Sequence, residues 1–142
     1  MVLKKQRIIG LLTLLAGLPG LGGFWLIGQL DNLPQFATII VFNAIFFRGL
    51  CGIVGGIFIW RGSIWGYYLT LLTWLYLIIV SVLTLNQLYN SGLVFSYSFL
   101  EENYSSFGRA FLLSSLKILF GIPIVYMVIN VLLKAYKSND PV

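Results

Sequence analysis

Charged and catalytic side chains are scarce in this chain of 142 residues. Charged residues make up only 9 % of it, histidine is absent, and Cys51 is the single cysteine. Without histidine the chain cannot ligate haem through imidazole or use a histidine in acid–base catalysis. One cysteine cannot form an internal disulfide or a thiol–disulfide relay. We therefore expect no metal, no cofactor and no enzymatic activity.

Acidic residues are also rare, since the chain has only 4 of them. None lies inside a long apolar run, so a membrane-embedded carboxylate of the kind that couples transport to protons or cations is missing. The net charge of +5 could indicate a nucleic-acid partner in a soluble protein. Here the positions of the basic residues matter more than their sum, and we expect no nucleic-acid partner.

Long apolar runs dominate what remains, because hydrophobic residues make up 59 % of the chain. Four runs each reach the length of about 20 residues that a helix needs to cross a bilayer. No room is left for a separate soluble domain. The sequence therefore predicts an all-α membrane protein, a single domain of residues 1–142 with four transmembrane helices at about 8–30, 36–60, 64–85 and 110–133.

Basic residues flank these runs asymmetrically. Six of them fall on one side of the predicted hairpin array, and the opposite side has Arg109 alone. The positive-inside rule then places both termini in the cytoplasm, in a plasma or other energy-transducing membrane. Residues 86–108 become a structured extracytoplasmic loop, in which Phe95, Tyr97 and Phe99 alternate with serines as in an extended segment.

The first run has an alternative interpretation as a signal peptide. A basic segment, an apolar run and small residues after Pro19 follow the order of such a peptide. Cleavage would leave three helices. The apolar run resumes at Phe24–Leu30 and no Ala-x-Ala site is present, which favours a retained helix.

Small and hydroxylated residues share faces of the predicted helices. Glycines recur on one face of the first helix, and Gly52 and Gly56 are four residues apart on the second. Such faces let helix backbones approach closely, either within the chain or toward a protein partner or a second copy. Thr70, Thr73 and Ser81 form a polar stripe on the third helix, which is either a hydrogen-bonded seam between helices or the wall of a polar path. We expect the small and hydroxylated residues to face protein, namely Gly52, Gly55, Thr70, Thr73, Ser114 and Gly121. On the third helix, Leu72, Ile79 and Leu83 are expected to face lipid or a partner.

Arg48 lies at the middle of the second run, about 18 Å from either end. A charge at this depth needs a partner, a wet cavity or a snorkelling path, and it is a functional-site hypothesis by default. Backbone carbonyls, hydroxyl groups of the third helix and the acids of the outer loop are its candidate partners. Lys117, in the fourth run, is a second cation that leans outward. The candidate intramembrane polar site comprises Arg48, Lys117, Thr70, Thr73, Glu101 and Glu102.

Size and helix count resemble those of small multidrug transporters and fluoride channels. The transporters' embedded glutamate is absent, and their balanced loop charge is absent too. The hypothesis that best fits the sequence is a non-enzymatic accessory, assembly or scaffold component of a membrane complex, in contact with the lipid bilayer. The alternative is a pore or carrier for an anion or an anionic lipid headgroup, with Arg48 and Lys117 as its cationic lining.

Overall fold

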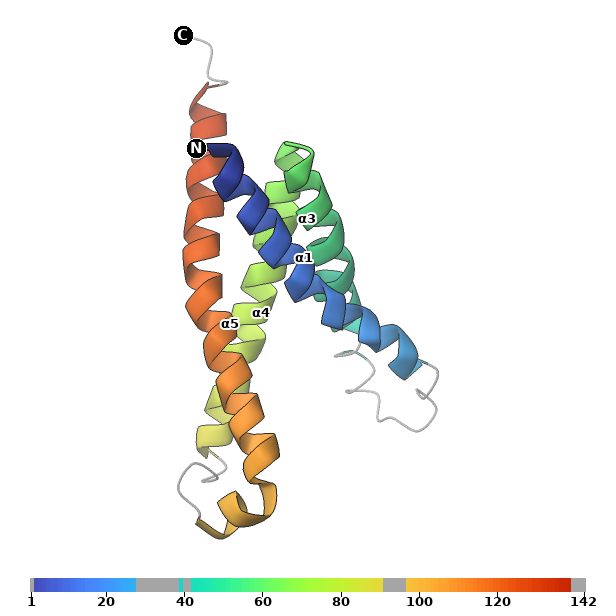
Figure 1. Cartoon of the computed structure of the whole chain (residues 1–142), viewed down its shortest axis with the longest axis vertical. Coiled ribbons are helices and arrows are strands. Elements are labelled where there is room, and N and C mark those ends of the chain that lie inside the picture. Colours follow the sequence, from blue (N-terminus) through green and yellow to red (C-terminus); the bar gives the residue numbers. More distant parts are fainter. Residues whose placement is uncertain (1, 28–38, 40–41, 91–96, 139–142) are drawn as a thin grey trace. The chain divides into compact units, whose positions relative to one another are not determined.

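The computed structural model describes residues 2–27, 39, 42–90 and 97–138. These residues confirm the all-helical fold, and they form four helices if a π-helical segment and the α-helix that continues it are counted together. Figure 1 shows the helices in chain order. The bounds are α1 Val2–Ile27, the π-helix η2 Ala44–Leu50, α3 Cys51–Trp60, α4 Ile64–Asn90 and α5 Tyr97–Ser138.

Two of the described helices are long and apolar enough to cross a membrane. These are α4 and the segment Ala110–Lys137 of α5, with mean hydropathies of 2.1 and 2.2. The apolar segments Gln6–Gly22 and Ala44–Trp60 are shorter. Within the described residues, the structure therefore shows a helical bundle with two candidate membrane-spanning helices.

The helices extend further than the apolar runs predict. α4 continues to Asn90 instead of ending near residue 85, and α5 begins at Tyr97 instead of near residue 110. The predicted extended conformation is wrong for Tyr97 and Phe99, which are helical, while Phe95 lies outside the described residues. Hydropathy marks the part of a helix that suits hydrocarbon, and polar residues with good helix propensity can continue the same helix beyond it.

The chain divides into two compact units. Unit 1 comprises Met1–Tyr76 and Ile124–Val142, and unit 2 comprises Leu77–Pro123. Unit 1 thus contains α1, η2, α3, the first half of α4 and the end of α5. Unit 2 contains the rest of α4 and the preceding part of α5.

A line of glycines holds α1 against η2 and α3 in unit 1, where α1 crosses α3 (Figure 1). A Cβ atom on Gly52 would lie 2.9 Å from the Cα of Gly17, and one on Gly56 would lie 2.7 Å from the carbonyl oxygen of Gly10. No side chain fits between backbones this close, so glycine is required here. The small faces predicted on the first two helices therefore pack against each other.

A tight turn joins α3 to α4, as the sequence predicts. Gly62 has a φ of +74°, which an L side chain rarely adopts. The amide of Gly62 donates to the carbonyl of Ile59 at 3.0 Å, and the amide of Ser63 donates to that of Phe58 at 2.9 Å. These two bonds are those of a Schellman motif, which caps the end of α3.

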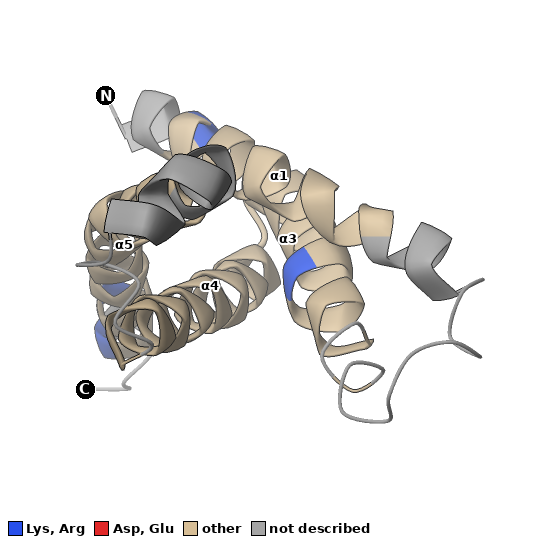
Figure 2. Cartoon of the chain, turned by 90° about the horizontal axis from the view of Figure 1, so that it is seen from below, with Lys and Arg blue, Asp and Glu red and all other residues tan. Residues whose placement is uncertain are grey.

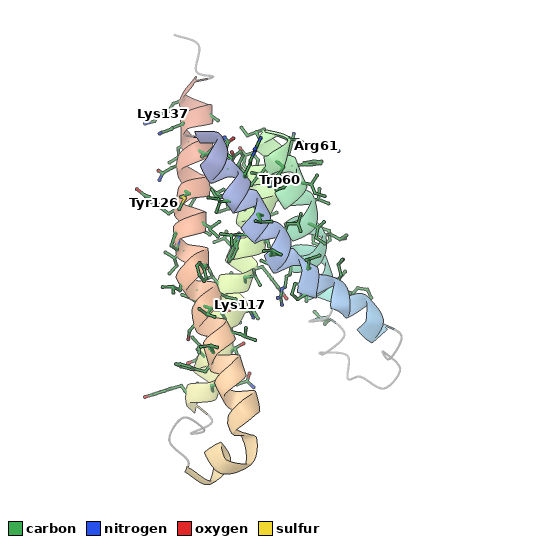
Figure 3. All side chains as sticks on the ribbon, in the orientation of Figure 1. Trp60, Arg61, Lys117, Tyr126 and Lys137 are labelled. Carbon is green, nitrogen blue, oxygen red and sulfur yellow. The ribbon has the colours of Figure 1, made fainter. Side chains whose placement is uncertain are left out.

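This turn, the N-terminal end of α1 and the C-terminal end of α5 lie at the same end of unit 1 (Figure 1). Trp60, Arg61 and Lys137 are labelled at that end in Figure 3. None of the side chains that the structure describes is acidic, and Figure 2 accordingly shows charged residues in blue only. The described ends of these helices therefore form a basic end of unit 1.

The predicted division between buried and exposed positions is confirmed. Leu72, Ile79 and Leu83 on α4 are exposed, with exposed fractions of 44 %, 57 % and 60 %. The residues predicted to face protein are all buried, namely Gly52, Gly55, Thr70, Thr73, Ser114 and Gly121. Cys51 is also buried and free.

Candidate functional site

Arg48 lies in the π-helical segment η2. There the backbone hydrogen bond reaches one residue further than in an α-helix, and the amide of Cys51 donates to the carbonyl of Phe46. π-Helical turns are rare and are frequent at functional sites. Nothing in the sequence predicted one here, because the segment Ala44–Leu50 has the composition of an ordinary apolar helix.

Thr73 of α4 completes the hydrogen bonding of this π-helical segment. An α-helical bond from Gly52 would reach the carbonyl of Arg48, so the carbonyl of Phe47 is passed over where the two helix types meet. The hydroxyl of Thr73 donates to that carbonyl oxygen at 3.0 Å, and it lies equally close to the carbonyl oxygen of Leu69 in its own helix. Thr73 thereby ties α4 to η2 at the residue before Arg48.

The side chain of Arg48 is half-buried and bonds to α1. Its Nε–H donates to the carbonyl oxygen of Ala16 at 2.9 Å. Ala16 lies in the turn before Pro19, which is inside α1 and has no backbone N–H to donate. The missing N–H leaves the carbonyl of Leu15, four residues before Pro19, without its helical donor, and Ala16 is the next residue along α1. The predicted backbone-carbonyl partner of Arg48 is thus confirmed.

Four of the five N–H donors of Arg48 are on its two Nη atoms. Within the described residues these Nη groups have no hydrogen-bond partner. The hydroxyl of Tyr76 is close enough for an electrostatic interaction with the guanidinium, and the ring of Tyr76 stacks on Phe47 with 5.6 Å between centroids. The site therefore has one structural hydrogen bond and spare donor capacity.

A second hydrogen-bonded link joins α1 to α4. The indole Nε1 of Trp74 donates to the hydroxyl oxygen of Thr13 at 3.0 Å, and this hydroxyl donates to the carbonyl oxygen of Ile9 at 2.8 Å. Together with the bonds of Thr73, this link favours a seam between helices over the wall of a polar path. Sequence reasoning singled out the threonine stripe and missed Trp74, whose position beside Thr73 was the available signal.

The structure unites only part of the predicted site. Arg48 and Thr73 belong to one cluster in unit 1, and the hydroxyl of Thr70, one turn away from Thr73, is buried with no hydrogen-bond partner. Lys117 belongs to unit 2, where it is half-buried in α5. Glu101 and Glu102 are in α5 as well, but their side chains lie outside the described residues.

Unit 2 has an open cavity of about 500 Å³ between α4 and α5. Its lining is almost entirely apolar, and Lys117 is not part of it. The lining residues are Leu85, Ser115, Ile118, Leu119, Ile122 and Pro123. A lining of this kind does not provide an anion site.

The fold and the site together define a helical bundle with two candidate membrane-spanning helices and a half-buried arginine at a contact between helices. No protein-family model, curated protein or solved structure matches the chain. Among the described residues, no group of three or more His, Cys, Asp or Glu side chains could hold a metal ion. Arg48 is thus the chemical centre of the candidate site.

Proposed function

We propose that this chain is a multi-pass membrane protein with four transmembrane helices and both termini in the cytoplasm. In this proposal it acts as a non-enzymatic accessory, assembly or scaffold component of a membrane complex. The hydrogen bond from Arg48 to the carbonyl of Ala16 carries the proposal, because the one charge at the middle of its helix is used to fasten α1 to η2. Arg48 then works as a clamp inside the bundle.

The division between inner and outer faces supports this role. The hydroxyls of Thr13 and Thr73 bond inside unit 1, and the outer face of α4 is apolar and exposed. In a bilayer such a face contacts lipid or the helix of a partner.

Retention of the first helix is part of the proposal. Removing α1 as a signal peptide would uncover the backbones of Gly49, Gly52 and Gly56, which pack against glycines of α1. Trp60 and Trp65, with exposed fractions of 61 % and 67 %, flank the α3–α4 turn as residues of an interfacial aromatic belt do.

Site-specific photo-crosslinking tests the accessory role. A photoreactive amino acid at Ile79 or Leu83, on the exposed face of α4, should give a discrete cross-link to one protein, either a partner or a second copy. The same group at Tyr136, which is exposed near the end of α5, serves as the control. Cross-links to lipid alone from both α4 positions would contradict the proposal.

The Nη donors of Arg48, which have no partner among the described residues, favour a second candidate, the pore or carrier for an anion or anionic lipid. Arg48→Leu separates the two roles. If Arg48 is a clamp, this change should lower the melting temperature of the ligand-free protein and its unfolding free energy, the latter by about 1 kcal/mol. A buried hydrogen bond of a charged group contributes roughly 1.5–3 kcal/mol, and the figure is smaller here because the side chain is half-exposed. Arg61→Leu, at the exposed turn, should have little effect.

Melting curves of both variants and the unmodified protein, with and without phosphate, sulfate or chloride, provide the measurement. A clamp predicts no response to anions. An anion site predicts that anions raise the melting temperature of the unmodified protein and that Arg48→Leu abolishes this rise while the fold survives. If all proteins melt alike in every solution, Arg48 is a snorkelling residue and both roles fail.

A further inference from the structure

A second cavity, with a partly polar lining, lies in unit 1, and Arg48 is not among its lining residues. It has a volume of about 300 Å³ and is open on one side. This volume is at the lower end of the range of small-molecule sites, about 300–1,000 Å³. Residues of α1, α4 and α5 contribute to it, and they are Gln6, Ile9, Tyr67, Met127, Asn130, Val131 and Lys134.

Tyr67 gives this cavity a buried polar group without a partner. Its exposed fraction is 4 %, and among the described residues its hydroxyl has no hydrogen-bond partner. The side chain of Gln6 lies close to this hydroxyl, but not in the geometry of a hydrogen bond. A buried hydroxyl without a partner is unfavourable, and an acceptor supplied by a ligand would remove that cost.

The polar lining is suited to an anion. Lys134 is the charged residue among the described residues of the lining. Tyr67 can donate through its hydroxyl, and the amides of Gln6 and Asn130 can also donate. No carboxylate is present among the lining residues to compete for these donors. Ile9, Met127 and Val131 form the apolar part, and methionine adapts well to a flexible hydrocarbon chain.

The cavity lies at the basic end of unit 1. Gln6 is near the start of α1, and Lys134 is one turn before the end of α5. The exposed indole of Trp60 donates to the carbonyl oxygen of Arg7, the residue after Gln6, at 3.1 Å. Tryptophans of this kind lie at the level of lipid headgroups, and basic cavities between helices on the cytoplasmic side bind anionic headgroups.

We propose that this cavity binds the phosphate group of an anionic phospholipid. The phosphate oxygens accept hydrogen bonds from Lys134, Tyr67 and the amides of Gln6 and Asn130. The first methylenes of an acyl chain pack on Ile9, Met127 and Val131. This inference rests on the proposed membrane location of the chain and is independent of the proposed accessory role.

Lipid binding to charge-matched variants tests the proposal. Native mass spectrometry of the protein in detergent, with phosphatidylglycerol or phosphatidylcholine added, should show preferential retention of phosphatidylglycerol. Lys134→Gln should weaken this retention about fivefold, as expected for one lysine at a membrane surface. Lys137→Gln removes the same charge from the same helix outside the cavity and should leave retention unchanged. Equal effects of the two changes, or no preference for phosphatidylglycerol, would overturn the proposal.

Tyr67→Phe gives a test with opposite signs. Without lipid this variant should melt at a higher temperature than the unmodified protein, because it removes a buried hydroxyl that has no partner. Phosphatidylglycerol should then stabilise it less than it stabilises the unmodified protein. Tyr126→Phe is the control, since Tyr126 points outward and is 68 % exposed (Figure 3). A lower melting temperature without lipid, with full stabilisation by lipid, would assign Tyr67 a purely structural role and overturn its part in binding.

Soluble anions decide the source of the phosphate. If phosphatidylglycerol stabilises the protein through Lys134 and inorganic phosphate or glycerol 3-phosphate does not, the ligand is a lipid. If the soluble anions act equally through Lys134, the phosphate chemistry is supported and the lipid is not. If neither the lipid nor the soluble anions stabilise the protein through Lys134, the site is refuted. Reporter fusions that place the C-terminus in the cytoplasm would then show that the proposed membrane topology survives.

Discussion

Two threonines one turn apart on α4 are both completely buried, yet their hydroxyls have opposite hydrogen-bonding states. Thr73 donates to the carbonyl of Phe47. The hydroxyl of Thr70 has no partner among the described residues, and a Cβ atom on the neighbouring Gly55 would lie 3.2 Å from the Oγ1 of Thr70. A buried polar group without a hydrogen bond costs free energy, whereas a hydrogen-bonded one contributes a modest stabilisation. The same substitution should therefore have opposite effects at the two positions.

Thr73→Val should lower the unfolding free energy by about 1–3 kcal/mol, because it leaves the carbonyl of Phe47 without a donor inside the bundle. Thr70→Val should be neutral or stabilising, because it removes a hydroxyl that bonds to nothing. Unfolding in mixed micelles measures the change in unfolding free energy of both variants. The two values can be compared directly because both residues are buried on the same helix. Equal losses at the two positions would show that Thr73 is not needed to complete η2.

The sequence predicted the residues of this site better than their bonds. A charge at the middle of an apolar run required a partner, and backbone carbonyls were among those expected for Arg48. The choice of Ala16 could not be predicted, because it depends on where α1 crosses η2. The cavity around Tyr67 was missed for a similar reason, because predicting it requires knowing how α1, α4 and α5 are positioned along one another.

At the scale of the helices, α1 and α3 are held together by contacts between their backbones. Gly20 of α1 lies so close to the backbone of Gly49 that a Cβ atom there would overlap it. Gly22, two residues later on the same helix, has nothing within 4 Å of its Cβ position. The two glycines therefore have different roles, although the sequence around them is similar.

Gly20→Ala should force α1 away from η2 and lower the unfolding free energy by about 1–3 kcal/mol, the usual cost of overpacking. Gly22→Ala should raise it by up to about 1 kcal/mol, through helix propensity alone. Unfolding curves of the two variants test the difference. If Gly20→Ala proves as stable as Gly22→Ala, the close crossing of these helices is wrong.

The pairing of the first two predicted helices could be predicted, because the spacing of their glycines, Gly17 and Gly52 among them, is visible in the sequence. The π-helical segment was not, since no side chain in η2 distinguishes it from an α-helix. The far ends of α4 and α5 were underestimated because the prediction followed hydropathy, which ends where polar residues begin. Those polar residues still form helix.

For the whole molecule, the distribution of charge is the feature on which the proposed orientation rests. Lys134 and Lys137 of α5 and Arg61 of the turn belong to the basic end of unit 1, and the N-terminal end of α1 lies there too (Figure 1). Two described helices are long enough to span a bilayer, and the proposal of four spans adds α1 and the helix of η2 and α3. Orientation is therefore open to a direct experiment.

Reporter fusions test this orientation. Because basic residues are retained on the cytoplasmic side, a C-terminal fluorescent protein should be bright and a C-terminal alkaline phosphatase inactive. Fusions near Ser91 should give the reverse result. Changing Arg61 to glutamate should weaken the preference for a cytoplasmic C-terminus without inverting it, since the basic residues near both chain termini remain. An active phosphatase at the C-terminus would refute the charge argument and the four-span arrangement together, whereas loss of an N-terminal tag from the mature protein would establish cleavage of the first helix.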